Sequence, residues 1–298
     1  MEPGQPSRTA ISTALCRAAH LHLYPGPKIH EDTFALALSD IGGVDELRAF
    51  AEQVEQVNFP FRRAAAYFAF RHRFSEERLL AAVNRGVKQV IILGAGLDSF
   101  ALRHPQVPKD VLFLEIDHPD SQRWKRERLS SLGLETPGVH YLPIDFASQD
   151  LQTELTCAGV DRAKPSFFAW LGVTQYVAAE VTYETLALVA RQARGSQIVF
   201  DVIHPIDAQP PDERDMSRIS DAVSAAQGEP WVSYFAPESL SGRLASIGFN
   251  RVEWLTPETL RVYYQGQPRE VRPIGAWQVI AATVAPPNPS RERISIGG

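Results

Sequence analysis

The chain of 298 residues contains little sulfur: two cysteines, Cys16 and Cys157, and two methionines. Two cysteines this far apart provide neither a disulfide framework nor a zinc site, and they suit a reducing compartment. The longest apolar runs are strand-sized, well short of the ~20 residues that a membrane span requires. No basic segment followed by an apolar run opens the chain, so no signal peptide is predicted. We therefore expect a cytoplasmic protein with neither a membrane association nor a bound metal.

Long basic blocks are also absent. Lys and Arg total 30, Asp and Glu total 35, and the net charge is -5. This balance excludes the basic footprint that is typical of nucleic-acid-binding proteins. Hydrophobic residues make up 44% of the chain, which is enough for a sizeable core in one large domain or two small ones. The sequence gives no indication of the oligomeric state.

Residues 8–85 are rich in Ala, Leu and Arg and lack β-branched runs, which predicts helices. Pro and Gly predict breaks at 24–27 and 58–60, and a short helix is expected over Ser75–Asn84, with Ser75 as its N-cap and Gly86 as its stop. We interpret residues 1–85 as an N-terminal helical cap. The first seven residues and residues 285–298 are rich in Pro, Gly and Ser, and we expect flexible tails there.

After residue 86, short apolar runs alternate with helical stretches. This pattern predicts an α/β fold with a doubly wound, Rossmann-like, mostly parallel sheet. The expected parallel strands are 90–93, 111–114, 139–144, 167–171 and 198–203, with a helix such as 119–132 between two of them. A helix at 237–247 and an antiparallel pair at 251–255 and 277–284 complete the predicted core, residues 86–284. The polar connector 205–230, with a short helical pattern near 218–227, is long enough to act as a lid.

The sharpest motif is Gly94-Ala95-Gly96, directly after the first predicted strand. Glycine suits a tight turn where a ligand approaches the backbone closely. Asp117 ends the second strand, about 20 residues further on, where an acidic side chain binds ribose hydroxyls in such folds. Its alternative role is to cap the helix at Pro119. Asp145 and Phe146 follow the third strand, either as adenine contacts or as an ordinary turn.

These segments together resemble the leucine carboxyl methyltransferase-like family of S-adenosylmethionine-dependent methyltransferases, whose bacterial members include many small-molecule O-methyltransferases. The resemblance covers roughly residues 7–284. It is carried by Gln89–Arg103, Glu115–Pro119, Pro143–Phe146 and Phe168–Tyr176, with weaker similarity at Ser7–Ala10 and Arg71–Phe74. A family glutamate five residues before Tyr176 is replaced here by Leu171, so the amino group of the cofactor must be held by other groups.

The resemblance implies S-adenosyl-L-methionine as cofactor and S-adenosyl-L-homocysteine as product. It implies that Gly94, Ala95 and Gly96 contact the methionine part, that Asp117 holds the ribose, and that Arg71 reaches a carboxylate of cofactor or substrate. Asp145 and Phe146 would frame the adenine. Three residues in or beside these motifs complete the predicted cofactor site: Asp98, His118 and Trp170.

Methyl transfer requires alignment, exclusion of water and, for a hydroxyl acceptor, a base. The catalytic candidates are Arg71, Tyr176 and His204; Tyr176 could equally be a core aromatic residue, and His204 a plain loop histidine. A carboxylate acceptor is favoured over a hydroxyl, because a guanidinium can bind a carboxylate through two hydrogen bonds. The nearby Arg62 and Arg63 are interpreted as solvated charge.

Two other functions are compatible with the sequence. An NAD-dependent oxidoreductase shares the glycine loop and the later acid, although Ser99 stands where the third small residue of that fingerprint belongs. A non-catalytic protein that binds S-adenosylmethionine or another metabolite is the second alternative, because Leu171 replaces an acid. We expect a methyltransferase that acts on a small molecule, with secondary metabolism as one candidate setting. The sequence does not identify the acceptor.

Overall fold

The computed structural model describes residues 7–146 and 149–284, so the tails predicted before Ser7 and after residue 284 lie outside the described residues. The N-terminal part forms helices α1 (Arg8–His22), α2 (Ala35–Leu38), α3 (Val44–Glu55) and α4 (Phe61–Asn84). The breaks predicted at 24–27 and 58–60 are confirmed. The prediction of a separate short helix from Ser75 was wrong, because α4 runs unbroken for 24 residues. Glu76 therefore does not lie in the first turn of a helix, and its carboxylate instead pairs with Arg103 at 2.8 Å.

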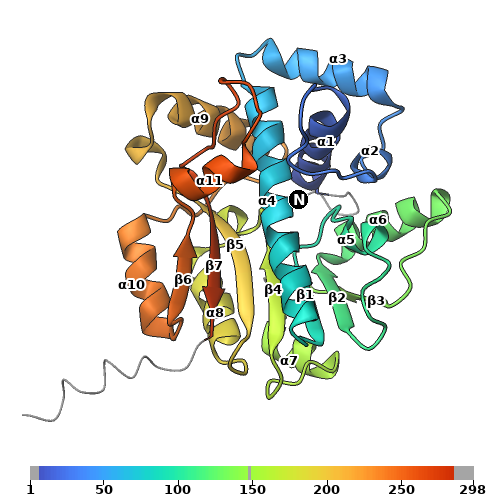
Figure 1. Cartoon of the computed structure of the whole chain (residues 1–298), viewed down its shortest axis with the longest axis vertical. Coiled ribbons are helices and arrows are strands. Elements are labelled where there is room, and N and C mark those ends of the chain that lie inside the picture. The colour runs from blue at the N-terminus through green and yellow to red at the C-terminus, as the bar shows by residue number, and fades with distance from the viewer. Residues whose placement is uncertain (1–6, 147–148, 285–298) are drawn as a thin grey trace, which may run out of the picture.

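Seven strands form one sheet in the order β3-β2-β1-β4-β5-β7-β6 (Figure 1). β7 runs antiparallel to β5 and to β6, and the other pairs are parallel, so the predicted Rossmann-like sheet with a C-terminal antiparallel strand is confirmed. The strands are β1 (Gln89–Leu93), β2 (Leu112–Asp117), β3 (Val139–Pro143), β4 (Ser166–Trp170), β5 (Gln197–Ile203), β6 (Arg251–Trp254) and β7 (Trp277–Thr283).

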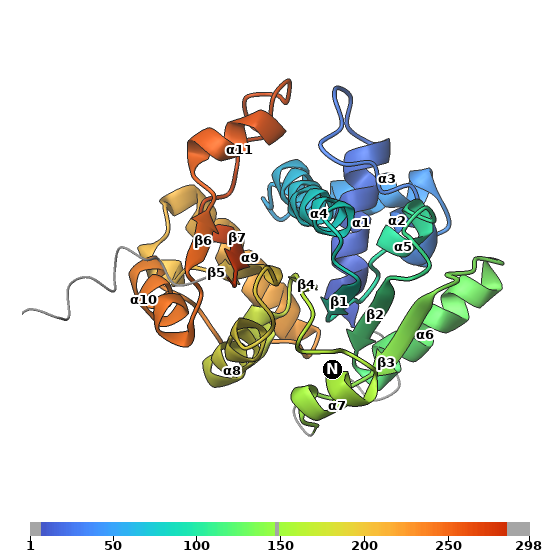
Figure 2. The same cartoon turned by 60° about the horizontal axis from the view of Figure 1, so that its bottom comes forward.

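Helices cover both faces of this sheet, which explains why its central strands are almost purely apolar. β1 and β4 are buried along their whole length. One face packs against α4, and the other against α8 and α10 (Figure 2). The remaining helices are α5 (Phe100–Arg103), α6 (Pro119–Ser131), α7 (Leu151–Cys157), α8 (Ala179–Ala190), α9 (Pro211–Ala226), α10 (Pro237–Ile247) and α11 (Pro257–Tyr263), with 3-10 turns η1 (Thr174–Tyr176) and η2 (Ile206–Ala208).

The segment 205–230 is more regular than its sequence indicated. It contains η2 and the 16-residue helix α9, so the short helical pattern expected near 218–227 underestimated the helix. Pro211 stands in the first turn of α9, where its missing N–H costs no hydrogen bond. Asp212 and Glu213 follow it and favour the positive end of the helix dipole.

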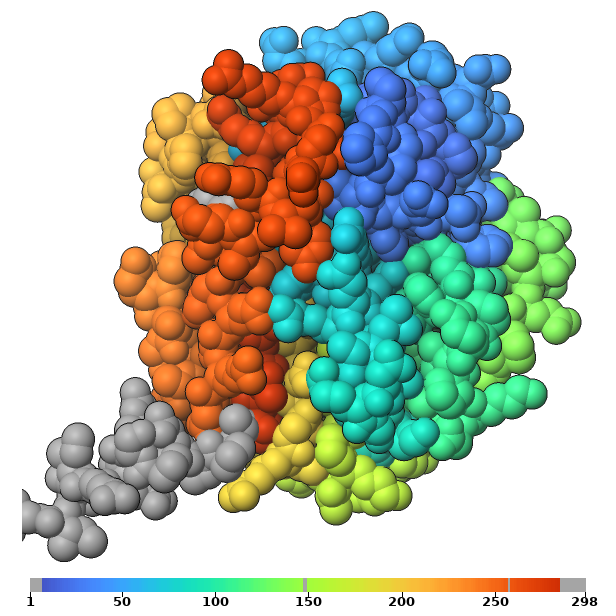
Figure 3. Space-filling model, viewed as in Figure 1, coloured from blue at the N-terminus to red at the C-terminus, as the bar shows by residue number. Residues whose placement is uncertain are grey.

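The N-terminal helices share contacts with the rest of the chain. α4 lies in the same apolar core as the sheet, and Figure 3 shows the N-terminal helices (blue) beside the C-terminal segment that carries α11 (orange). Gln267 donates to the carbonyl of Pro27 there, at 2.6 Å. Arg63, interpreted from sequence as solvated, is buried and pairs with Glu213 at 2.8 Å. None of the helices in the described residues has the length and apolar character to cross a membrane.

Candidate active site

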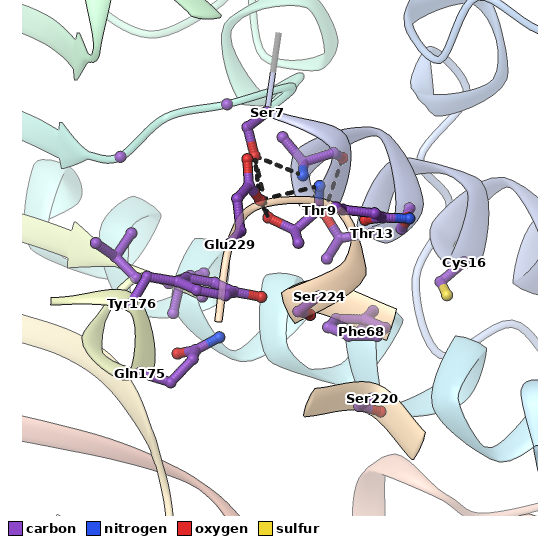
Figure 4. Close-up of a pocket in the computed structure, with 18 of the residues that line it drawn as sticks. Ser7, Thr9, Thr13, Cys16, Phe68, Gln175, Tyr176, Ser220, Ser224 and Glu229 are labelled. Carbon is purple, nitrogen blue, oxygen red and sulfur yellow. Dashed lines mark hydrogen bonds between the residues drawn. The ribbon is translucent and has the colours of Figure 1, made fainter. Parts of the chain in front are cut away.

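A cavity of about 630 Å³ opens at the carboxyl ends of the parallel strands. This is the edge at which open α/β sheets bind ligands. Its floor comes from the loops after β1, β2, β3 and β4, and its walls come from α1, α3, α4, η1 and α9 (Figure 4). The volume lies in the range of about 300–1,000 Å³ that is usual for small-molecule sites.

The predicted glycine loop forms part of this floor. Gly94 and Gly96 both have positive φ, +63° and +46°, which side chains rarely tolerate. A Cβ at position 94 would lie 2.3 Å from Cγ2 of Val173, and one at 96 would lie 3.1 Å from the Cβ of Ala10. The amide of Ala95 donates to the carbonyl of Ile116, which ties the loop to β2 at 3.0 Å. The loop therefore exposes backbone to the cavity because it has no side chains at two positions.

Asp117 ends β2 beside this loop and lines the cavity. Its Oδ2 accepts from the amide of Gly96, and its Oδ1 accepts from the amide of His118 at 2.7 Å. Burial raises the pKa of Asp117, and these amide hydrogen bonds oppose the rise. His118 also lines the cavity, where its Nδ1 accepts from the amide of Asp120 and caps α6. Helix capping is thus done by His118, which leaves Asp117 directed at the cavity.

The other predicted floor residues lie nearby. Asp145 and Phe146 follow β3 and line the cavity, as does Asp98, whose Oδ1 accepts from the amide of Phe100 at 2.8 Å. Leu171 lines it as well, as an apolar side chain packed against the core.

Arg71 comes from the middle of α4 and is buried beneath the cavity. Its Nη1 donates to Oδ2 of Asp201 at 2.8 Å, and its guanidinium lies over the ring of Phe68 at 4.8 Å. Burial disfavours the charge, but Asp201, Tyr67 and Tyr176 together outweigh it, and the pKa of Arg71 is raised. A Cβ at Gly172 would lie 2.9 Å from Nη1, so glycine lets the guanidinium approach the loop after β4.

Tyr176 extends from η1 into the cavity, on the side formed by α9 (Figure 4). The neighbouring Gln175 is fixed by its backbone, since its carbonyl accepts from the amides of Val232 and Ser233 at 2.7 and 3.3 Å. η1 is thereby held against the segment that follows α9.

The structure places two predicted site residues away from the cavity. Trp170 is fully buried with Phe168 in the core on the opposite face of the sheet. Side chains alternate along a strand, so the residue at this end of β4 that faces α4 is Ala169. His204 follows β5, but its amide donates to the carbonyl of Ala276, and the ring is not among the side chains that line the cavity.

Several lining residues had not been identified from sequence. Asp201 sits inside the apolar strand β5, and a lone charge in such a run was the available signal. Arg17 is buried in α1. Its Nε donates to Asp32 at 2.8 Å, and its Nη2 donates to the carbonyl of Leu97 at 2.7 Å. Glu229 accepts at Oε2 from the hydroxyl of Ser7 at 3.2 Å and from the amide of Thr9 at 3.3 Å. Nothing local in the sequence indicated the last two roles.

Comparison with known proteins identifies the family. The sequence profile described as "Leucine carboxyl methyltransferase" matches residues 10–190. The chain belongs to this family. The match includes the glycine loop, Asp117, Asp145 and Tyr176, so the resemblance read from the motifs is confirmed. The chain is an S-adenosylmethionine-dependent methyltransferase.

Curated relatives support this assignment. The chain is 29% identical over 282 residues to the Bacillus subtilis (strain 168) protein named "Putative S-adenosyl-L-methionine-dependent methyltransferase YktD", covering 87% of this chain and 91% of that protein. A Mycobacterium avium (strain 104) protein with the same type of name is 32% identical, with 65% of this chain and 63% of the relative covered.

Solved structures agree on the fold alone, because their identities are low. A methyltransferase structure from Thermobifida fusca YX, titled "putative", has a TM-score of 0.56 at 14% identity and covers 96% of this chain and 97% of its own. A DUF574 family protein from Streptomyces avermitilis has a TM-score of 0.55 at 16% identity and covers 83% of this chain and 94% of its own.

The cavity residues fit S-adenosylmethionine. The side-chain-free turn at Gly94 and Gly96 gives backbone access, and the carboxylate of Asp117 at the end of β2 suits vicinal ribose hydroxyls. Arg71 offers a buried cation for a carboxylate, since Nη1 alone of its nitrogens bonds to a side chain in the part of the chain that the structure describes. Asp145 and Phe146 present a hydrogen-bond acceptor and a ring for a purine.

Proposed function

We propose that this enzyme methylates an oxygen atom of a small, largely apolar molecule. The observation that carries this proposal is the continuity of the cavity, which runs from the strand ends into a chamber with aromatic walls. We call the floor from Gly94 to Asp98, with Arg71, Asp117, His118, Asp145 and Phe146, the cofactor half. We call the chamber the acceptor half; it is formed by Phe59, Phe68, Gln175, Tyr176, Ile219, Ser220, Val223, Ser224, Trp231 and Trp277.

S-adenosylmethionine supplies a methyl group on a positively charged sulfur and leaves as S-adenosylhomocysteine. The residues of the chain position the two reactants and exclude water from the space between them. The acceptor half is bounded by α4, η1 and α9, whose apolar side chains exclude water. η1 is fixed to the segment after α9, so Tyr176 at the junction of the halves is held in place. Such positioning is the main contribution that a protein makes to an in-line displacement.

The choice between a carboxylate and a hydroxyl acceptor depends on whether the cavity offers a cationic side chain that is free to pair with a carboxylate. Among the described residues that line the cavity, the only Lys or Arg side chains are Arg17 and Arg71, and each pairs with an aspartate. The preference for a carboxylate rested on Arg71, whose Nη1 is committed to Asp201. This arrangement gives more support to a hydroxyl acceptor, because a hydroxyl requires no counter-charge. As its oxygen bonds to the methyl group and the bond from that carbon to sulfur breaks, the hydroxyl proton would pass to a base of the lining, for which His118 and Glu229 are the candidates.

The test is turnover with a panel of matched acceptors. The protein is incubated with methyl-labelled S-adenosylmethionine and pairs of compounds that share a ring and differ in a hydroxyl or carboxylate group. Mass spectrometry then follows S-adenosylhomocysteine and labelled product. We expect O-methylated product from hydroxyl compounds, and far less from an Asp117→Ala control at the same limiting cofactor concentration.

Binding of S-adenosylmethionine without product from any acceptor would support a non-catalytic role instead. A thermal shift with NADH where S-adenosylmethionine gives none would point to the oxidoreductase alternative.

A further inference from the structure

Asp201 is a charged residue within the apolar strand β5, and it lines the cavity. Its neighbours on the same face of the strand, Val199 and Ile203, belong to the core that packs against α4. Asp201 is 5% exposed. A carboxylate buried to this extent is costly unless it is paired, so a charge at this position needs partners. Arg71 is one partner, and the surroundings of the pair indicate a second.

Three hydrogen bonds fix the carboxylate of Asp201. Its Oδ1 accepts from the amide of Gly172 at 2.6 Å. Its Oδ2 accepts from Nη1 of Arg71 at 2.8 Å and from the hydroxyl of Tyr67 at 3.4 Å. A carboxylate has about four lone-pair sites, two on each oxygen. Oδ1 therefore keeps one acceptor site that no described residue uses.

The ion pair lies against the glycine turn of the cofactor half. A Cβ at Gly172 would lie 2.9 Å from Nη1 and 3.1 Å from Nη2 of Arg71, so the guanidinium packs on this residue. The next residue, Val173, lies so close to Gly94 that a Cβ at position 94 would come within 2.3 Å of its Cγ2. Two successive residues of the loop after β4 thus contact the ion pair and the glycine turn, which places the pair beside the methionine part of a bound cofactor.

The other acids of the cavity lining lie after β1, β2 and β3 or on the segment after α9: Asp98, Asp117, Asp145 and Glu229. None of these four pairs with Arg71, so Asp201 is the acid that stands beside the buried cation. The loop after β4 supplies no charge of its own, because the side chains with which it lines the cavity, Leu171 and Val173, are apolar.

The amino-acid end of S-adenosylmethionine carries a carboxylate and an ammonium group. A guanidinium suits the carboxylate, and a carboxylate with a free lone pair suits the ammonium. Arg71 alone would attract the first group but repel the second, and it would also repel the positively charged sulfur, since charges interact strongly in a buried site. Asp201 balances the charge of Arg71 and presents a hydrogen-bond acceptor.

We propose that Asp201 binds the ammonium group of S-adenosylmethionine while Arg71 binds its carboxylate, so that one buried ion pair recognises both charges of the amino-acid end. The free acceptor site on Oδ1 takes the ammonium. Nη2 of Arg71 takes the carboxylate, because it bonds to no described residue and, unlike Nε, is not among the fully buried unpaired nitrogens. Asp201 is then a cofactor-binding residue as well as the counter-ion of Arg71, and this role is independent of the methyl acceptor.

The experiment measures binding by calorimetry with four probes that share the adenosine and sulfur. They are S-adenosylhomocysteine, its deaminated analogue, its decarboxylated analogue, and 5′-methylthioadenosine, which lacks both charged groups. Asp201→Asn keeps an oxygen for the amide of Gly172 and removes the negative charge. We expect this variant to bind S-adenosylhomocysteine roughly 10-fold or more weakly, since it loses a charged hydrogen bond. The deaminated analogue should bind with unchanged or higher affinity, because it has no ammonium to lose and Arg71 is freed for its carboxylate.

Arg71→Met should give the opposite pattern, with weaker binding of S-adenosylhomocysteine and unchanged or tighter binding of the decarboxylated analogue. Each single variant leaves one buried charge without its partner, which can unfold the protein. The double variant Arg71→Met with Asp201→Asn avoids this problem because it removes both charges. It should bind S-adenosylhomocysteine and 5′-methylthioadenosine with affinities within roughly 3-fold of each other, whereas the wild type should prefer S-adenosylhomocysteine by roughly 100-fold.

Glu213→Gln is the matched control. Glu213 is a buried acid that pairs with Arg63, also on α4, at 2.8 Å, but it does not line the cavity. A general weakening of α4 by the loss of a buried ion pair would appear in this variant too. It should keep the wild-type order of affinities among the four probes. Melting temperature and circular dichroism show whether each variant is folded.

A purely structural role for Asp201 would lower the affinity for all four probes alike, and that result would overturn the inference. So would an equal loss for S-adenosylhomocysteine and its deaminated analogue in Asp201→Asn, or a double variant that retains the wild-type preference. A wild type that binds neither S-adenosylhomocysteine nor 5′-methylthioadenosine would contradict the cofactor site itself. The proposed O-methylation is tested separately, because no methyl transfer takes place in these measurements.

Discussion

The cofactor half and the acceptor half of the cavity are built in different ways. In the cofactor half, backbone atoms and side chains at successive strand ends are already bonded to one another, as Asp117 is to the amides of Gly96 and His118. In the acceptor half, helices and connecting segments contribute apolar walls, and Gln175 and Trp231 keep polar atoms without partners in the described chain. A floor of polar groups already bonded to one another suits a ligand with fixed polar groups, whereas apolar walls select a ligand mainly by its shape.

The largest expected effect tests whether the N-terminal helices support the cofactor half. Arg17 of α1 bonds to buried Asp32 and to the carbonyl of Leu97 in the glycine loop. Arg17→Met leaves buried Asp32 with only the more distant Arg103, at 3.6 Å, as a cationic neighbour, so we expect a loss of about 3–5 kcal/mol in the free energy of unfolding. Urea denaturation measures it. The double variant with Asp32→Asn should recover part of the loss, and a loss below about 1 kcal/mol would mean that this pair is dispensable.

Asp117→Ala tests the cofactor half directly. Two ribose hydrogen bonds to a charged group would be lost, together with the tie to Gly96, and we expect the affinity for S-adenosylmethionine to fall by about 2–4 kcal/mol. Calorimetry on protein with an unchanged circular dichroism spectrum gives the answer. An unchanged cofactor affinity would refute the assignment.

The same contrast explains what the sequence could predict. Strand runs, glycine turns and acids at strand ends are local patterns, so all seven strands were predicted, and the predicted site residues Gly94, Gly96, Asp117 and Asp145 line the cavity. Trp170 was placed on the wrong face, because only the register of the sheet decides which of two neighbouring strand residues faces α4.

Local patterns indicated little of the acceptor half beyond aromatic residues such as Tyr176. Glu229 meets Ser7 and Thr9 across more than two hundred residues of sequence, and Gln175 is fixed by the backbone of Val232 and Ser233. No short-range spacing reports contacts of that kind, which depend on how helices pack against the finished sheet.

Glu229 lies where the two halves meet, and its expected effect is smaller. Its carboxylate bonds to the hydroxyl of Thr9 and the amide at the start of α1, where the helix dipole favours a negative charge. Glu229→Gln removes the charge and should weaken this contact by about 1 kcal/mol, which corresponds to roughly 5-fold faster release of S-adenosylhomocysteine. Stopped-flow fluorescence measures the rate. Glu238→Gln on α10 is the matched control, and equal rates in both variants would show that this contact does not retain the cofactor.

The smallest effect is expected at His204, which the sequence presented as a base for a hydroxyl acceptor. Burial lowers the pKa of His204, its carbonyl accepts from Nε2 of Gln209, and its ring lies outside the set of side chains that line the cavity. His204→Ala should therefore keep turnover within about twofold of the wild type. Arg71→Lys should lower turnover much more, since an ammonium cannot hold Asp201 and a ligand group with one planar fork. S-adenosylmethionine affinity, measured separately for both variants, distinguishes lost binding from lost chemistry. If His204→Ala abolishes turnover while its cofactor affinity is intact, His204 reaches the acceptor and the acceptor half extends past β5 toward Ala276.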